Sequence, residues 1–175
     1  MKIEFGEIAK NKQLIPDKVY EYIGSFDVGK EIKVVEINPQ YADGESLHNA
    51  YDVPYEMELN CLIVEGKRNG ISKYAALVVP YGKRANMNAK VRKPLDAKDV
   101  SFADLSYVTE VTGMEYGAIT PIGLPSDWLI LIDEQILNQE YVIVGGGLAK
   151  SKMMLPSRLF GKMENCIVVE GLAKD

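Results

Sequence analysis

The pattern of apolar and polar positions predicts short, separate elements in the first third of the chain. Apolar residues recur at helical spacing in Pro16–Phe26, where the proline suits a first helical turn. The apolar run Ile32–Ile37 predicts a strand, and Asn38–Gly44 has the composition of a turn. A second short helix is expected at Glu45–Asp52, before a proline.

The middle of the chain carries two apolar runs that predict a pair of neighbouring strands. Cys61–Glu65 and Tyr74–Pro80 are rich in Val, Ile and Leu, and the turn-forming stretch Lys67–Gly70 joins them. Strands of this composition are typical of a sheet interior. By contrast, Tyr81–Leu95 is polar with weak periodicity, so we expect a long exposed connection containing at most one helical turn.

The clearest helical pattern lies after residue 100. Ser101 is expected to cap this helix, with Asp104 as the acid of a weak capping box, and Gly113 is expected to end it. The apolar stripe that this helix would bury consists of Phe102, Leu105, Val108 and Val111.

The rest of the chain predicts further short strands and one last helix. Strands are expected at Ala118–Ile122, Leu129–Asp133, Tyr141–Val144 and Cys166–Glu170, and a helix at Leu155–Met163. Because helices and strands do not alternate regularly, we predict an α+β fold, a mixed β-barrel or curved sheet of short strands with surrounding helices. The length of 175 residues favours a single domain over residues 1–175.

Composition excludes several classes of protein. A hydrophobic content of 47% with 26% charged residues is typical of a globular chain, and no apolar run reaches the roughly 18 residues of a membrane span. The start of the chain has acids and no apolar stretch, unlike a signal peptide. We therefore expect a soluble, cytoplasmic protein.

Cysteine and histidine are too sparse for a metal centre or a disulfide framework. Cys61 and Cys166 both lie inside apolar runs and are expected to be buried thiols. His48 is the single histidine, and no G-x-S-x-G turn accompanies it, which argues against a serine–histidine hydrolase. No metal site is predicted.

Charge is distributed unevenly along the chain. Residues 61–100 hold nine bases and three acids, a net charge of +6, although the whole chain has a net charge of −5. Within Tyr81–Leu95 there is no acid. This segment either contacts nucleic-acid phosphates, with Tyr81 stacking on a base, or is a solvated charged loop. Its cations are Lys83, Arg84, Lys90, Arg92 and Lys93.

Two glycine-containing segments are candidate sites. Gly117–Pro125 has glycine and proline at both ends, and the apolar run Tyr141–Val144 leads directly into the triplet Gly145–Gly147. Adjacent glycines let backbone N–H groups approach a ligand oxygen without a Cβ in the way, although a plain turn accounts for them equally well.

The order and spacing of these motifs resemble the YbaK/prolyl-tRNA synthetase-associated domain family. That family has a helix ending in Leu/Val-Thr-Gly, a Gly-x-x-x-Pro loop, a strand with a V-D-E-like element, and a strand ending in Gly-Gly-Gly. The counterparts here are Val111–Gly113, Gly117–Pro121, Ile132–Glu134 and Gly145–Gly147. The resemblance extends over about residues 50–163, which leaves residues 1–45 as a family-atypical amino-terminal extension.

The resemblance implies trans-acting hydrolysis of the ester that joins a wrong amino acid to its tRNA, without a metal or organic cofactor. It implies the 3′ end of an aminoacyl-tRNA as partner, an aminoacyl-tRNA synthetase as a second partner, and neither a membrane nor DNA. Asp133 would be a structural support. The implied catalytic residues are Asn60, Gly117, Gly145 and Gly146, and the implied substrate-binding residues are Ala118, Ile119, Thr120, Pro121, Gly147 and Leu148.

The sequence departs from the family at its key lysine. Ungapped alignment of Val53–Ile63 places Asn60 on the family lysine and Glu58 where an apolar residue is common. Leu148 follows the glycine triplet where relatives often have a small polar residue or histidine. Lys150 and Lys152 either supply the missing charge or are solvated surface lysines.

Three functions therefore remain open from the sequence. The first is a deacylase, weakened or altered by the asparagine, and the second is a non-catalytic module that binds charged tRNA or a synthetase. The third is a small-ligand binding domain. If the resemblance extends to the site, Asn60, Gly117 and Gly145 should converge around one concavity.

Overall fold

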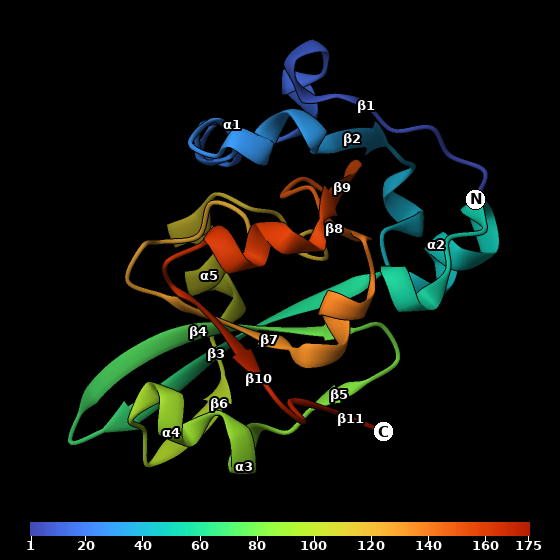
Figure 1. Cartoon of the computed structure of the whole chain (residues 1–175). Coiled ribbons are helices and arrows are strands. Elements are labelled where there is room, and N and C mark those ends of the chain that lie inside the picture. Colours follow the sequence, from blue (N-terminus) through green and yellow to red (C-terminus); the bar gives the residue numbers. More distant parts are fainter.

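The computed structural model of the chain describes all residues 1–175 and has a mixed five-stranded sheet at its centre (Figure 1). The strand order is β10-β7-β4-β3-β6. The central pair β3 and β4 is antiparallel, whereas β4, β7 and β10 are parallel neighbours. The predicted interior strand pair is therefore confirmed. These strands are β3 (Leu59–Arg68), β4 (Ile71–Pro80), β6 (Asp99–Phe102), β7 (Leu129–Asp133) and β10 (Cys166–Val169).

A second sheet is antiparallel throughout, in the order β1-β2-β9-β8. One parallel bridge between Glu58 and Ile143 connects the start of β3 to β8. The predicted mixed fold of short strands with few helices is confirmed, but the strands form separate sheets and no closed barrel. The remaining strands are β1 (Gly6–Glu7), β2 (Lys33–Glu36), β8 (Tyr141–Gly145), β9 (Ser151–Pro156) and the small pair β5 (Arg84–Ala85) with β11 (Ala173–Lys174).

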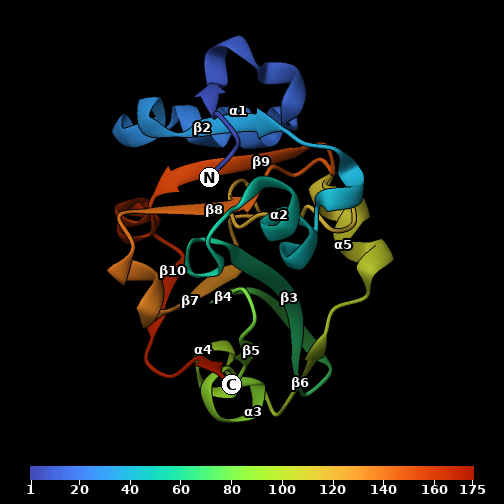
Figure 2. The same cartoon turned by 90° about the vertical axis from the view of Figure 1, so that its right-hand side faces the viewer.

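Short helices flank the two sheets. Figure 2 shows α1 and β2 at the top, β8 and β9 below them, then the five-stranded sheet, with α3 and α4 at the bottom. The helices are α1 (Asp17–Gly24), α2 (Gly44–Tyr51), α3 (Met87–Lys90), α4 (Arg92–Leu95) and α5 (Leu105–Thr112). Short 3-10 helices lie at Ile8–Lys10, Lys12–Leu14, Asp27–Glu31, Pro39–Tyr41, Tyr55–Met57, Glu134–Asn138 and Ser157–Lys162. None of the helices has the length and apolar composition that a membrane crossing requires.

The amino-terminal segment packs into the main core. Val19 and Ile23 of α1 are buried in the same apolar cluster as residues of β4, β7, β8 and β9. A Cβ at Gly123 would lie 3.1 Å from the Cα of Val19, so the loop before β7 needs a glycine to pack this closely against α1. The amino-terminal helix α1 thus packs against the loop that follows α5.

The predicted helix after residue 100 begins later than expected. Ser101 lies in β6 opposite Glu65 of β3, so its backbone is extended, and Asp104 is the actual N-cap. The Asp104 carboxylate accepts hydrogen bonds from the N–H groups of Ser106 at 2.9 Å and Tyr107 at 3.2 Å. Gly113 ends the helix with a φ of 69°, as predicted. The predicted apolar stripe is only partly buried, because Phe102 and Leu105 are 63% and 44% exposed.

One predicted strand is wrong, and one predicted helix is shorter than expected. Ala118–Ile122 is an irregular loop instead of a strand, because Gly117 and Gly123 at its two ends adopt φ values of 80° and 86° that interrupt an extended chain. Leu155 and Pro156 belong to β9, where Leu155 pairs with Val142, so the predicted helix at Leu155–Met163 is reduced to the 3-10 helix Ser157–Lys162. Pairing with β8 therefore holds the first two residues of the predicted helix in a strand.

The segment Tyr81–Leu95 is more ordered than a long exposed connection. It contains β5, α3 and α4, and Val91 and Leu95 are buried against the outer face of the five-stranded sheet. Four of its five cations therefore lie on ordered elements, β5, α3 and α4, and not on a flexible loop.

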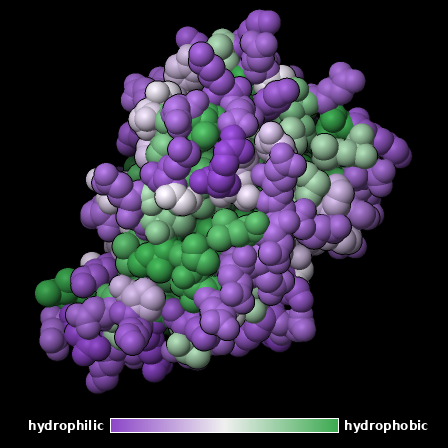
Figure 3. Space-filling view, in the orientation of Figure 1, coloured by the Kyte–Doolittle hydropathy of each residue, from purple (hydrophilic) through white to green (hydrophobic).

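Exposed apolar surface gathers at the edges of the five-stranded sheet. Figure 3 shows a hydrophobic area over the part of the molecule where β10 lies. Ile167 and Val168 of β10 are 41% and 48% exposed, and Phe102 is exposed on the opposite edge strand, β6.

Candidate functional site

A cavity of about 570 Å³ lies where the two sheets meet, and we call it the β3–β8 cavity. Its walls come from the starts of α2 and β3, the residue after β4, the loop after α5, and the facing ends of β8 and β9. Asn60, Gly117 and Gly145 all line it, although they are far apart in the sequence. The expected convergence of these three residues is therefore present in the structure.

The loop Gly117–Pro121 contributes a short stretch of backbone to this cavity. Gly117 and Ile119 line the cavity, whereas Ala118, Thr120 and Pro121 are buried behind it. Neither the Gly117 nor the Ile119 N–H group donates to a backbone carbonyl. Among the residues of this loop that line the cavity, these two N–H groups are therefore free to donate to a ligand. The Thr120 hydroxyl is buried without a hydrogen-bond partner.

The glycine triplet is required mainly by close packing. A Cβ at Gly145 would lie 2.7 Å from the Ala118 carbonyl oxygen, and one at Gly146 would lie 1.9 Å from the Ser151 Oγ. Gly147 adopts a φ of 86° against Pro16. Of the three, only Gly145 lines the cavity.

The N–H groups of Gly146 and Gly147 are not free as the sequence suggested. The Gly146 N–H donates to the Ser151 carbonyl oxygen at 3.2 Å, and the Gly147 N–H donates to the Ala118 carbonyl oxygen at 2.9 Å. The structure thus assigns these two glycines to the scaffold that holds the loop Gly117–Pro121. Leu148 is half-buried and does not line the cavity.

A buried ion pair lies in the cavity wall. The Lys152 Nζ is 3.6 Å from the Glu58 Oε1, and the side chains are only 6% and 2% exposed. Both residues line the β3–β8 cavity. The interpretation of Lys152 as a solvated surface lysine is therefore wrong, because β9 carries it into the interior opposite Gly145.

The environment disfavours the charged form of both partners. Burial raises the pKa of the Glu58 carboxyl, and the positive charge of Lys152 acts in the opposite direction. Burial likewise lowers the pKa of the Lys152 ammonium, against the stabilising charge of Glu58. Removing two ions from water costs several kcal/mol each, and a separation of 3.6 Å recovers only part of this cost. The pair is therefore not expected to stabilise the folded protein relative to two apolar side chains.

Three aromatic rings form a stack that begins in the cavity wall. His48 and Tyr55 have ring centroids 4.1 Å apart, and Tyr55 and Tyr81 have centroids 5.2 Å apart. Tyr81 lines the cavity, and a Cβ at Gly44 would lie 2.2 Å from its ring. The glycine at the start of α2 therefore makes room for the Tyr81 ring. Sequence analysis identified Tyr81 but not the stack, because its partners come from other segments.

The first two cations of the basic segment follow Tyr81 closely in the sequence and are already engaged. Lys83 pairs with the carboxylate of Asp175, and the Arg84 Nη2 donates to the Asp175 backbone oxygen at 3.0 Å. Their segment begins at Tyr81 in the cavity wall and continues into β5.

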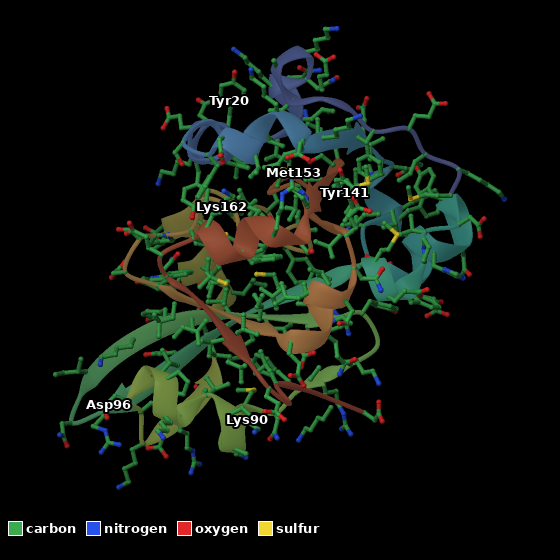
Figure 4. All side chains as sticks on the ribbon, viewed as in Figure 1. Tyr20, Lys90, Asp96, Tyr141, Met153 and Lys162 are labelled. Carbon is green, nitrogen blue, oxygen red and sulfur yellow. The ribbon has the colours of Figure 1, made fainter.

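The other three cations of this segment lie on the far side of the five-stranded sheet from β9 (Figure 2). Figure 4 places Lys90 low on the ribbon and Met153 of β9 in its upper half. Arg92 and Lys93 on α4 are exposed, and the Arg92 Nη2 donates to the Asn88 Oδ1 at 3.4 Å. None of the five cations lines the cavity, and Lys90, Arg92 and Lys93 lie on α3 and α4, away from it.

Asp133 supports the fold at the end of β7. It is fully buried, and its carboxylate accepts hydrogen bonds from the N–H groups of Gln135 at 2.9 Å and Ala173 at 2.7 Å. It does not line the β3–β8 cavity. This geometry fits the structural part that the sequence suggested for it.

The two cysteines are free and partly buried, so the expectation of buried thiols is met only in part. Both pack against the main apolar cluster, and this desolvation raises the pKa of each thiol to about 12. The structure arranges no group of three or more His, Cys, Asp or Glu side chains for a metal ion.

Thiol reagents should react slowly with the folded protein at pH 8. A pKa about three units above the ordinary value of 9.0 lowers the thiolate fraction about a thousandfold, and the thiolate is the reactive form. The rate should rise about tenfold per pH unit. Ellman's reagent measures both rates, and guanidinium-unfolded protein is the control. Fast reaction of either thiol in the folded protein would contradict this prediction.

Residues 38–160 match the aminoacyl-tRNA editing domain family. Because the match covers more than half of the chain, the chain belongs to this family, and the resemblance seen in the sequence is confirmed. Residues 1–37 lie outside the match. A proline–tRNA ligase of Listeria welshimeri serovar 6b is 22% identical over 141 residues, which cover 80% of this chain and 23% of the ligase. The chain thus spans less than a quarter of that relative.

Solved structures share the fold. The hypothetical protein APE2540 superimposes with a TM-score of 0.76 at 22% identity, over 90% of this chain and 100% of that protein. A proposed trans-editing enzyme for prolyl-tRNA synthetase superimposes with a TM-score of 0.73 at 17% identity, over 92% of this chain and 99% of that protein.

Proposed function

We propose that this chain hydrolyses the ester of mischarged aminoacyl-tRNAs in trans. The observation that carries the proposal is the meeting of Asn60, Gly117 and Gly145 in one cavity of a chain that belongs to the editing family. The resemblance in fold to a proposed trans-editing enzyme supports the trans-acting arrangement.

The loop after α5 would stabilise the charge that develops during hydrolysis. A water oxygen forms a bond to the ester carbonyl carbon, and the carbonyl π electrons move to its oxygen. The ester C–O bond then breaks, the ribose oxygen leaves with the electron pair and takes a proton from the attacking water. The free N–H groups of Gly117 and Ile119 face the developing oxyanion. Each such donor typically contributes about 3 kcal/mol to the barrier reduction.

Asn60 would contribute a neutral amide to the same cavity. It is the second residue of β3 and is fixed opposite Val79 in the ladder. An amide both donates and accepts hydrogen bonds, so it can orient the attacking water or the terminal ribose. It adds no positive charge, in contrast to the family lysine.

The tRNA 3′ end would enter beside the aromatic stack. Tyr81 lies in the cavity wall with Tyr55 and His48 stacked behind it, and a base stacked on such a ring typically contributes about 1–3 kcal/mol. The cations Lys83, Arg84, Lys90, Arg92 and Lys93 lead away from that point and would follow the acceptor stem. An aminoacyl-tRNA synthetase is the second proposed partner, supported by the likeness to a proline–tRNA ligase.

The test is a deacylation assay on a panel of mischarged tRNAs, with correctly charged tRNAs as controls. We expect faster release of at least one wrong amino acid than in buffer alone. If every tRNA stays charged, the deacylase proposal fails.

A non-catalytic module that binds charged tRNA is the second candidate. The asparagine at the family lysine position and the engaged N–H groups of Gly146 and Gly147 favour it. Binding of charged tRNA without hydrolysis would establish this function instead.

Affinity for tRNA should depend on the far end of the basic segment. Replacing Lys90, Arg92 and Lys93 with alanine should lower affinity at least about tenfold at low salt, and the salt slope by about two to three, because each lost phosphate contact removes about one unit. Filter binding at several salt concentrations measures both quantities.

The matched control removes three exposed cations at the other end of the molecule. Alanine at Lys18, Lys30 and Lys33 should change tRNA affinity by less than about twofold. If both triple variants lowered tRNA affinity equally, the basic segment would contribute only through the net charge of the protein and not through contacts of its own.

A further inference from the structure

The Glu58–Lys152 pair has unused bonding capacity inside the cavity. The Glu58 Oε2 is buried and has no hydrogen-bond partner. The distance of 3.6 Å from the Lys152 Nζ to the Glu58 Oε1 is longer than the roughly 2.8 Å of a direct charge-assisted hydrogen bond. A strong acceptor and a strong donor therefore stand side by side without satisfying each other.

The backbone on both sides fixes this arrangement. Glu58 bridges Ile143, its N–H donates to the Tyr55 carbonyl oxygen at 3.2 Å, and its own carbonyl oxygen accepts from the Tyr81 N–H at 2.8 Å. Lys152 is held opposite Gly145 in the β8–β9 ladder. The two charges are thus preorganised before any ligand binds. A pair of apolar side chains would fill the same space without the cost of burying charge, so the charges need a different explanation.

We propose that this pair recognises the α-aminoacyl group of the substrate. The Glu58 carboxylate accepts hydrogen bonds from the free α-ammonium, and the Lys152 ammonium donates to the ester carbonyl oxygen. This inference rests on the proposed deacylase function and names the substrate as an ester with an unblocked α-amine.

The chemistry of the pair selects this fragment over other ligands. In an aminoacyl ester the ammonium nitrogen and the carbonyl oxygen are on the order of 3 Å apart, because their carbon atoms are bonded to each other. That spacing fits an acceptor and a donor separated by 3.6 Å. A phosphate or an isolated carboxylate would meet the negative charge of Glu58. N-acylation removes the positive charge of the substrate and leaves Glu58 unmatched.

In this arrangement Lys152 supplies the positive charge that Asn60 lacks. During hydrolysis the water oxygen bonds to the carbonyl carbon, the negative charge on the carbonyl oxygen faces the Lys152 ammonium, and the ribose oxygen leaves with its electron pair and a proton from the water. The pair itself makes and breaks no covalent bond. The cation has moved from β3 to β9 but faces the same cavity.

The test compares free and blocked amines on a ligand that cannot be hydrolysed. The probes are 3′-alanylamino-3′-deoxyadenosine, in which an amide replaces the ester, and its N-acetyl derivative, both titrated by calorimetry. The wild type should bind the free amine at least tenfold more tightly. Glu58→Gln should abolish that preference, and Lys152→Met should weaken both ligands. Lys150→Met, which changes a neighbouring lysine outside the cavity wall, should bind as the wild type does.

Single-turnover deacylation gives the second readout. Wild-type protein should hydrolyse a mischarged tRNA at least tenfold faster than its N-acetyl derivative, and Glu58→Gln should slow only the unblocked substrate. The doubly neutral variant Glu58→Gln/Lys152→Met tests the same point without an unpaired buried charge. It should treat the two probes alike.

The outcomes separate this inference from the function on which it rests. No hydrolysis by the wild type, together with a preference for the free amine, would overturn the deacylase proposal and leave the recognition of the aminoacyl group. Equal binding of both probes by the wild type would overturn the inference. So would a Glu58→Gln variant that loses both probes by the same factor, because that result marks a purely structural pair.

Discussion

Replacing Lys152 with methionine is expected to lower the free energy of unfolding by about 3 kcal/mol, since it leaves the buried Glu58 carboxylate without its cation. Replacing both residues, with Glu58→Leu added, should recover most of that loss or exceed wild-type stability. In such a double variant no charge is buried, and the apolar side chains fill a similar volume. Urea unfolding followed by circular dichroism measures all three free energies.

The advantage of the double variant should depend on pH in a defined direction. The raised pKa of Glu58 means that its contribution to stability is present at low pH and is lost as the pH rises through the folded-state value. The lowered pKa of Lys152 means that its contribution is present at high pH and is lost as the pH falls through the folded-state value. The free energy of unfolding of the wild-type protein should therefore fall furthest below that of the double variant at pH values between these two folded-state pKa values.

Lys150→Met serves as the control, because Lys150 lies just before β9, two residues from Lys152, and makes no ion pair. It should change stability by less than about 0.5 kcal/mol. A Lys152→Met variant as stable as this control would show that the Glu58 carboxyl is already protonated and needs no partner.

The sequence predicted those elements whose signals are local. Leu129–Asp133 is a strand with the predicted bounds, and β8 follows the predicted Tyr141–Val144 closely, because continuous apolar runs in short segments favour buried strands. The errors lie where a distant partner overrides local preference. Ser101 could cap a helix, but pairing with β3 holds it in a strand.

The site was predicted in part for a similar reason. Motif order placed Asn60, Gly117 and Gly145 in one cavity, yet it could not tell which glycine N–H groups are engaged within the protein. The Glu58–Lys152 pair is 94 residues apart and joins two sheets. Its sequence signals were separate: Glu58 stands where relatives commonly have an apolar residue, and Lys152 follows the glycine triplet as one of two lysines that could supply the missing charge.

The next expected result comes from moving the cation back to the position of the family lysine. Lys152→Met should lower the rate of deacylation about a hundredfold, the effect of losing one strong electrostatic contact to the oxyanion. Adding Asn60→Lys in that background should recover at least tenfold. Asn60 lines the same cavity and lies two positions after Glu58, and residues two apart in an extended chain point to the same face.

A lysine at position 60 would also give the Glu58 carboxylate a new partner, so stability and rate should recover together. Asn60→Met in the same background is the matched control, because it has similar length and no charge, and it should recover neither. Single-turnover deacylation and urea unfolding on the same preparations measure both quantities. Equal rates for the lysine and methionine variants, with stability restored only by lysine, would mean that the cation must approach the ester from β9. In that case this chain would differ from relatives that carry the lysine on β3 in the strand from which the cation reaches the ester.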